Sequence, residues 1–416
     1  MKWKSVSIFA IGLLLTACQP QATSNNVAPA NANTNTNTTT PKTETAKKAA
    51  PTDLQQLAQR IVNQSAGVKE GEIVLVNGIA RDNDLLENIV IEIEKLGAYP
   101  LLSVDSEKLA KRSFSDVPEK YDTKEPKIGM ALAKIANVTI SIDGGETDGL
   151  LADIPPARLA ARAKAGAPVG KELIKNKVRS VSVGNDLYPT EWRAKRFEMP
   201  LDNFAKLFWD GVNIDYSGLQ TTGEKARATL AGKELEITHP NGTSLKLNLE
   251  SKPAYISDGI ISADDIAKGN LSVFLPAGEA AVIPAANSGT GKFVVEKDYF
   301  NGKEVHNVVF NFENGKLTSM TGEGDGFAAM KTDYDARGEG KDMLSYIDFG
   351  INPSYALAPS SKFGNWVSAG MVSVGTGNNT WAGGSNESTG AVGGHLAGCT
   401  VKIDGTTVVE NGVLKL

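Results

Sequence analysis

The interpretation of this chain depends on residues Asn270–Ala281, which read N-L-S-V-F-L-P-A-G-E-A-A. Its apolar run, 271–275, ends in Pro276 and Gly278, and Glu279 follows directly. Proline and glycine end a strand and force a turn. The stretch therefore predicts a carboxylate at a strand end, where binding and catalytic groups often lie. Two interpretations of Glu279 stay open: a metal ligand, or a structural hydrogen bond to the turn.

Residues 53–232, before this stretch, alternate between strand and helix patterns. The continuous apolar run 73–76 is typical of a buried parallel strand. An apolar helical stripe over 85–96 and a second strand, 99–104, complete a right-handed crossover. The sequence therefore predicts an α/β domain with a parallel sheet. No G-x-G-x-x-G follows the first strand, so dinucleotide binding is unsupported.

The same alternation continues along this domain. The patterns predict helices over 127–135 and from Pro155-Pro156 to about Lys164, and strands over 138–142 and 178–183. Between them, Asp143-Gly144-Gly145-Glu146 follows a strand directly. This segment is interpreted as either a ligand-binding loop or a plain turn.

Residues 233–416 have a different sequence pattern, which predicts many short strands separated by tight turns. Asn-Gly and Asp-Gly pairs between apolar runs are the strongest short hairpin signals. They stand at Asn241-Gly242, Asn301-Gly302, Asn314-Gly315 and Asp404-Gly405. We expect a mainly β domain, a curved sheet or barrel, with one helix near 333–338. The fold class is thus α+β overall.

The N-terminal residues predict that the protein is exported from the cytoplasm. Residues 1–18 combine Lys2 and Lys4 with an apolar run too short to span a membrane. The run ends in Leu15-Thr16-Ala17-Cys18, which resembles a bacterial lipobox and implies lipidation of Cys18. The alternative is an ordinary signal peptide with a chance cysteine. With lipidation, the protein would be held on a membrane of the cell envelope, outside the cytoplasm.

Residues 19–52 are rich in Asn, Thr, Ala and Pro and predict a disordered tether. Only two cysteines exist, so with Cys18 lipidated no disulfide framework or cysteine-based zinc site can form, and Cys399 is expected to be buried. The net charge of −5, without a basic run, makes nucleic acid an unexpected partner.

Five motifs after residue 237 resemble, in order, those of the thermophilic metallo-aminopeptidases, the family of aminopeptidases T and S. They are Thr238-His239-Pro240-Asn241-Gly242-Thr243-Ser244-Leu245, Leu275-Pro276-Ala277-Gly278-Glu279, Phe312-Glu313-Asn314-Gly315-Lys316, Gly383-Gly384-Ser385-Asn386-Glu387-Ser388 and Ile403-Asp404-Gly405. Gly71-Glu72 and Gly97-Ala98-Tyr99-Pro100 fit the family too, so the resemblance covers residues 53–416. It implies a two-metal exopeptidase, usually a homodimer, that uses zinc, cobalt or manganese to cleave N-terminal residues from peptides.

The family's ligand pattern is matched at one position only, Glu279. Its second glutamate falls on Tyr346 and its first histidine on Ser373, and its tyrosine falls near Asn379 or Thr380. Its final H-W-D is absent. A relative that opens aromatic rings with one iron shows that this scaffold can change reaction, but the two histidines and aspartate of that site are not found either.

Nearby residues offer substitutes. Asp348 lies on the strand face of Tyr346, and with His395 it joins Glu279 as a candidate metal ligand. The alternatives are a solvent-facing strand residue for Asp348 and a polar loop residue for His395. A ligand pocket in the Gly-rich segment 375–387 would use Trp381 as a stacking wall, with Asn378, Asn379 and Glu387 as candidate substrate-binding residues.

Two hypotheses about function follow. The first is a membrane-anchored metallo-aminopeptidase with a rebuilt metal site. The second is an inactive or repurposed homologue that binds a peptide or another small ligand as a lipoprotein, because most of the family's ligands are replaced.

Overall fold

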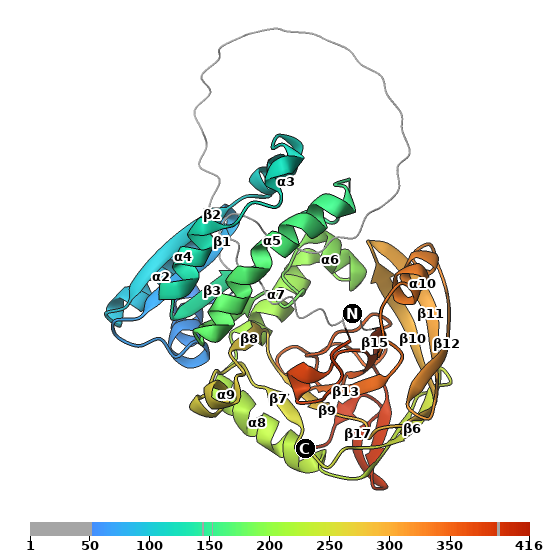
Figure 1. Ribbon diagram of the computed structural model, residues 1–416. Helices are drawn as coiled ribbons and strands as arrows, with labels where there is room; N and C mark the ends of the chain where they lie inside the picture. Colours follow the sequence, from blue (N-terminus) through green and yellow to red (C-terminus); the bar gives the residue numbers. More distant parts are fainter. Residues whose placement is uncertain (1–51, 144, 152, 389–391) are drawn as a thin grey trace.

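The computed structural model describes residues 52–143, 145–151, 153–388 and 392–416. A parallel α/β part is followed by a part built from two antiparallel sheets (Figure 1). This confirms the predicted α+β class. The predicted signal peptide, the lipidation site Cys18 and the tether up to residue 51 lie outside the described residues. Within the described part, no helix is long and apolar enough to cross a membrane.

The first sheet is parallel and has the order β2-β1-β3-β4-β8. Its strands are β1 (Ile73–Ile79), β2 (Tyr99–Asp105), β3 (Val138–Ile142), β4 (Arg179–Val183) and β8 (Ser272–Leu275). The central strand β3 is buried along its whole length, as its apolar sequence predicts. The order reverses between β1 and β3, and in α/β sheets the crevice at such a point is where ligands commonly bind.

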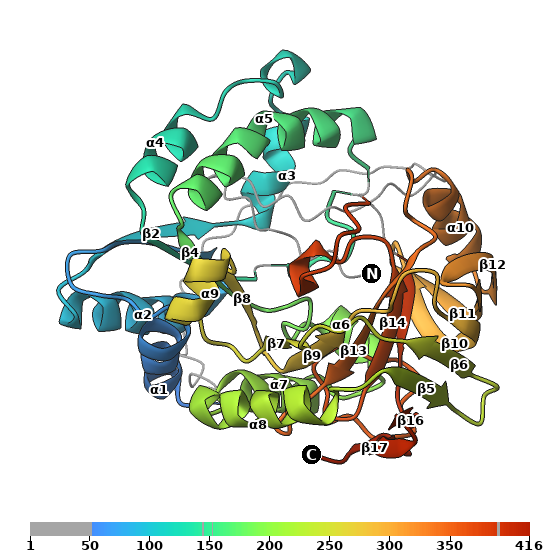
Figure 2. The same ribbon diagram turned by 60° about the horizontal axis from the view of Figure 1, so that its bottom comes forward.

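Helices cover both faces of this sheet (Figure 2). On one face lie α1 (Leu54–Gln59) and α2 (Asn83–Lys95), and on the other α4 (Lys127–Ile135) and α5 (Pro156–Lys175). The helix predicted to end near Lys164 runs on to Lys175 through the internal Pro168. The remaining helices are α3 (Glu107–Ser115), α6 (Glu191–Arg196), α7 (Leu201–Val212), α8 (Tyr216–Thr229), α9 (Ala263–Lys268) and α10 (Phe327–Asp335). The helix expected near 333–338 is therefore found earlier, as α10.

Strand β8 shows that the predicted division at residue 232 does not separate the sheets. It pairs in parallel with β4 of the first sheet, with Val181 opposite Val273. The next strand, β9 (Glu279–Val282), pairs with β13 in an antiparallel sheet of the second part. The chain thus returns to the first sheet after residue 232, because the run 271–275 can bury apolar side chains against β4.

The β-rich part contains an eight-stranded and a five-stranded antiparallel sheet. The first has the order β12-β11-β10-β6-β5-β16-β17-β18 and the second β15-β14-β13-β9-β7. The predicted hairpins are confirmed: Asn301 and Gly302 both have positive φ, as do Asn314 and Gly315. The strands are β5 (Glu234–Thr238), β6 (Ser244–Asn248), β7 (Tyr255–Ser257), β10 (Thr290–Phe300), β11 (Lys303–Glu313), β12 (Lys316–Glu323), β13 (Leu344–Gly350), β14 (Val372–Thr376), β15 (Gly393–Leu396), β16 (Thr400–Ile403), β17 (Thr406–Glu410) and β18 (Val413–Leu414).

A buried carboxylate in the α/β part gives a pH prediction. Asp122 accepts hydrogen bonds from Arg158 Nε and Arg162 Nε, both at 2.6 Å. The hydrogen bond from Arg158, assisted by Arg162, holds the pKa of the Asp122 carboxyl below its usual value. A carboxyl with a lowered folded-state pKa stabilises the fold above its unfolded pKa of about 4 and loses that contribution as pH falls through the folded value.

We therefore expect Asp122→Asn to be less stable than wild type at pH 7, by a margin that shrinks as the pH falls below about 4. Thermal unfolding followed by circular dichroism between pH 7 and pH 3 measures this margin. Asp335→Asn, in an exposed pair with Lys331, serves as the control. A margin for Asp122→Asn that is the same at every pH would contradict the assignment.

Candidate functional site

The turn between β8 and β9 places Glu279 at the start of a buried strand. Gly278 has φ +122° and its N–H donates to the Ser257 carbonyl at 2.9 Å. The Asn352 side chain, fully buried, donates to the Ala277 carbonyl at 2.7 Å and to the Gly211 carbonyl of α7 at 3.0 Å. Hydrogen bonds from both parts of the molecule therefore fix the turn. They also hold the backbone of Glu279, whose side chain is 2% exposed.

Four polar side chains share one face of the five-stranded sheet. Asp348 on β13 lies opposite Ala281 on β9 and opposite Ser373 on β14, and Ser373 lies opposite His395 on β15. Glu279 precedes Ala281 by two residues, so it shares the same face. All four are buried, and Asp348 is 0% exposed. We call Glu279, Asp348, Ser373 and His395 the polar row.

Two of the alternatives drawn from the sequence are wrong. Asp348 is not a solvent-facing strand residue, because it lies inside the sheet. His395 is not a loop residue, because it belongs to β15 and its Nδ1 lies 2.7 Å from Ser373 Oγ. Along the row the serine lies between the aspartate and the histidine. This order differs from that of a Ser-His-Asp triad, in which the carboxylate orients the histidine.

Comparison with known proteins identifies the family. The profile of the family described as "Thermophilic metalloprotease (M29)" matches residues 50–337. The chain belongs to this thermophilic metalloprotease family. A search of curated protein sequences finds no match.

Two solved structures share the fold of this M29 chain. Wild-type AmpT from Thermus thermophilus is similar with a TM-score of 0.65 and 16% identity, over 87% of this chain and 99% of AmpT. A 2,5-dihydroxypyridine dioxygenase from Pseudomonas putida KT2440 is similar with a TM-score of 0.54 and 13% identity, over 88% of this chain and 98% of the dioxygenase. At these identities the likeness concerns the fold.

The described residues of this M29 chain do not fit a two-metal centre. Among the described residues, no group of three or more His, Cys, Asp or Glu side chains could hold a metal ion. Glu279 and His395 stand on strands three spacings apart, about 14 Å, whereas donors to one ion lie within about 4 Å of each other. The predicted set of Glu279, Asp348 and His395 is thus on one face but not gathered around one point.

Two positions onto which the family resemblance maps other metal ligands have other contacts here. Tyr346 is 3% exposed, and its ring lies so close over Gly375 that a Cβ there would stand 2.2 Å from the phenol. Ser373 is hydrogen-bonded to His395. The Tyr346 phenol stands in place of a carboxylate and the Ser373 hydroxyl in place of an imidazole, and the replaced groups are the ones that bind divalent ions well. Metal ligation by this site therefore stays a prediction.

The Gly-rich loop contributes an aromatic wall beside the polar row. Trp381 Nε1 donates to the Asn378 carbonyl at 3.1 Å, and its ring meets Tyr346 and Tyr255 edge-on, each at 5.4 Å between centroids. Trp381 also packs over Ala281, the neighbour of Asp348 across the sheet. The predicted stacking wall therefore lies next to the two buried carboxylates.

The two asparagines of this loop hold its shape. The Asn379 side chain donates to the Ser345 carbonyl and accepts from the Asn386 N–H, both at 2.9 Å. The Asn378 side-chain oxygen accepts from the Thr380 N–H at 3.2 Å. Glu387 is exposed. Substrate contacts by these residues stay predictions, and the observed partners of the two asparagines belong to the loop itself or, for Asn379, also to β13.

Sequence reasoning did not identify the two asparagines that fix the site. Asn352 secures the turn before Glu279, and Asn386 joins the loop to the Gly340 carbonyl at 2.9 Å. Asn352 was readable only as a polar residue before Pro353, and Asn386 only as one between Ser385 and Glu387. An asparagine beside a proline commonly replaces a missing backbone hydrogen bond, and that is the signal that could have found Asn352.

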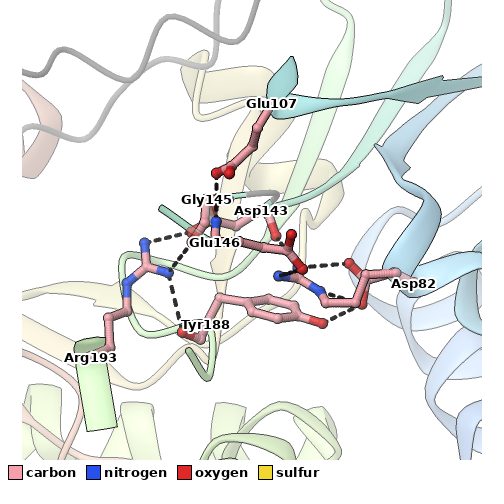
Figure 3. A network of polar contacts seen from close by, with 8 residues as sticks. Asp82, Glu107, Asp143, Gly145, Glu146, Tyr188 and Arg193 are labelled. Atoms are coloured by element: carbon pink, nitrogen blue, oxygen red, sulfur yellow. Dashed lines mark hydrogen bonds and ion pairs between the residues drawn. The ribbon is translucent and has the colours of Figure 1, made fainter. Parts of the chain in front are cut away.

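A second polar cluster lies where β1, β3 and β4 end, and contains the predicted loop residues Asp143, Gly145 and Glu146 (Figure 3). Arg193 donates to Asp143 Oδ2 at 3.0 Å, to the Tyr188 carbonyl at 3.2 Å and to the Gly145 carbonyl at 3.3 Å. Arg81 donates to the Asp143 carbonyl at 2.9 Å. Burial, and Asp82 beside it, raise the pKa of the Tyr188 hydroxyl. The donors and acceptors mostly serve each other, which favours the interpretation as a turn.

Proposed function

We propose that this chain recognises the free amino ends of peptides in an aminopeptidase-like manner, on the sheet face that carries the polar row. The observation that carries the proposal is the burial of Glu279 and Asp348 on that face, where they are diagonal neighbours on the adjacent strands β9 and β13. Carboxylates are seldom fully buried in proteins, and buried titratable groups cluster at functional sites. An α-ammonium group is the complementary charge, and a charge-assisted hydrogen bond would fix it there.

The aromatic wall supports a peptide ligand rather than a bare amine. Trp381 and Tyr255 are partly exposed, so a side chain of the ligand's first residue would pack on them. An ammonium near these ring faces also gains cation–π attraction. The family supports the same ligand class, because its members are proteases.

The second candidate function is hydrolysis of the terminal peptide bond, and the family match favours it. The family's chemistry relies on metal ions, and the donor set described above does not fit them. We therefore derive no hydrolytic step for this chain.

We further propose that the protein is a lipoprotein of the cell envelope, held through Cys18, and that it forms a homodimer as the family resemblance implies. Metabolic labelling with a palmitate analogue, lost in Cys18→Ala, tests the anchor. Analytical ultracentrifugation tests the dimer.

The functional test combines metal analysis, peptide binding and cleavage on one preparation. We expect metal-free protein that binds a Leu-terminated peptide, with Glu279→Gln weakening the binding about 10–100-fold through loss of a charge-assisted hydrogen bond. Glu410→Gln, at an exposed position at the end of β17, is the matched control and should bind like wild type. N-acetylation of the peptide should abolish binding.

The outcomes separate the two candidates. Two equivalents of zinc, cobalt or manganese together with cleavage of a leucine anilide would replace the proposal by the second candidate. Equal binding of the free and acetylated peptides, or no binding at all, would refute recognition of the amino end.

A further inference from the structure

Exposed apolar side chains are concentrated in one segment of the α/β part. Of the large apolar residues that the described chain leaves exposed, most lie between residues 91 and 135. On one face of β2 these include Tyr99 at 66% and Leu101 at 46% exposure, and on α4 Ile128 at 69% and Ile135 at 52%. Single exposed apolar residues are ordinary, but a contiguous group marks an interaction surface.

Sheet register and helix periodicity show that these residues are neighbours. Leu101 lies opposite Leu75 of β1, whose side chain packs beneath Leu132 of α4. Ile128, Leu132 and Ile135 lie on one helical stripe, while Gly129 on another face meets α5. The stripe therefore extends from the sheet toward the edge strand. We call Tyr99, Leu101, Ile128 and Ile135 the apolar edge.

The apolar edge is bare because β2 is the last strand of its sheet (Figure 2). Helix α4 packs against α5. The face of β2 that carries Tyr99 and Leu101 is therefore left uncovered. Both Figure 1 and Figure 2 show β2 well apart from β9 and β13, two of the strands that carry the polar row. The surface is thus remote from the polar row and has no part in the proposed peptide site.

Exposed lysines occur in the same segment of the chain as the apolar edge. Lys108, Lys120, Lys124, Lys127 and Lys134 are exposed, and none forms an ion pair within the described part of the chain. Residues 91–135 hold eight Lys and Arg and eight Asp and Glu, so this segment is neutral while the whole chain has a net charge of −5. Lys120 and Lys124 lie over the Tyr121 ring, at 5.0 and 6.0 Å from its centroid. Apolar groups ringed by lysines and tyrosines are typical of a surface that lies on an anionic bilayer.

We propose that the apolar edge and its lysines dock on the surface of an anionic lipid bilayer, the membrane that carries the protein's own anchor. The predicted tether, 19–52, holds 34 residues, and a flexible chain of that length spans about 30 Å, so a domain anchored at Cys18 would stay near that surface. At such a short distance even a weak contact is occupied most of the time. The inference uses the proposed anchor only for this argument, and its test does not depend on lipidation.

A second protein copy adding a strand to β2 is the competing occupant. Pro100 lies within β2 and lacks the N–H that strand addition would use. Proline on an edge strand commonly prevents such pairing. The structure therefore favours a contact made by side chains on a lipid surface.

The test uses the chain from residue 18 onward with Cys18→Ser, which keeps the tether and every described residue but cannot be lipidated. Co-sedimentation with phosphatidylcholine vesicles containing increasing phosphatidylglycerol measures binding. We expect binding that rises with the anionic lipid and falls with salt. Leu101→Glu combined with Ile128→Glu should reduce the bound fraction about 10-fold, since two charges replace inserted side chains.

Val413→Glu is the matched control, because Val413 is 52% exposed but lies in the β-rich part. It should bind vesicles like the parent chain, and circular dichroism should show all variants folded. Equal binding by the double variant and the control, or no binding to any vesicle, would overturn the proposal. A dimer that forms without vesicles and is lost in the double variant would instead assign the surface to self-association and also overturn it. Either result leaves the peptide-binding proposal to its own test.

Discussion

Gly278→Ala is expected to lower the free energy of unfolding by about 4 kcal/mol or more, among the largest effects of any single substitution in this chain. Gly278 has φ +122°, a region that costs residues with a side chain about 1–3 kcal/mol. An added Cβ would also stand 2.6 Å from Asn352 Cβ and 2.8 Å from the Asn352 backbone nitrogen. Since Asn352 is fully buried and bonded to both parts of the molecule, it cannot move aside cheaply.

Urea unfolding monitored by fluorescence measures the effect, and Gly269→Ala is the control. Gly269 has φ +81°, but a Cβ there would meet nothing within 4 Å. It should therefore lose only about 1 kcal/mol from backbone strain. Similar losses for the two variants would show that the contact with Asn352 is unimportant.

Arg193→Met should destabilise the protein by about 3–5 kcal/mol, because it removes one partner of a buried ion pair and leaves Asp143 without its cation. Arg193 is 6% exposed and joins the ends of β3 and β4 through Asp143, Gly145 and Tyr188. Methionine keeps much of the apolar volume, so the loss reports on charge and hydrogen bonding rather than on a cavity.

The same urea experiment on Arg112→Met provides the comparison. Arg112 is exposed and pairs with Asp116 within α3, and exposed pairs contribute about 1 kcal/mol or less. If Arg193→Met and Arg112→Met lowered the free energy of unfolding by the same amount, the polar cluster around Arg193 would not stabilise the ends of β3 and β4. That result would reopen the interpretation of Asp143–Glu146 as a ligand-binding loop.

Local signals in the sequence were enough for much of the fold. The Asn-Gly hairpins at 301–302 and 314–315 were predictable because few residues adopt positive φ easily. The apolar run 73–76 became the buried strand β1 for a similar reason, since its side chains need cover on both faces. These features depend on neighbouring residues alone.

Long-range pairing was not predictable in this way. Strand β8 pairs with β4 across some ninety residues, and only burial of both partners reveals it. The extension of α5 through Pro168 was also missed, because packing against α4 outweighs the local preference of proline. Of the site, Glu279 and Trp381 were found from motifs, whereas the contacts of Asn352 with α7 depend on tertiary structure.

The return of the chain to its first sheet has a consequence for biosynthesis. The parallel sheet lacks its last strand until residue 275 has been made, so β4 would remain an unprotected edge for much of synthesis. Open edges invite pairing with other chains. We expect the two halves to fold as one cooperative unit after the nascent chain is long enough, rather than as an N-terminal module that folds first. A truncation at residue 232 should accordingly aggregate rather than yield a soluble domain.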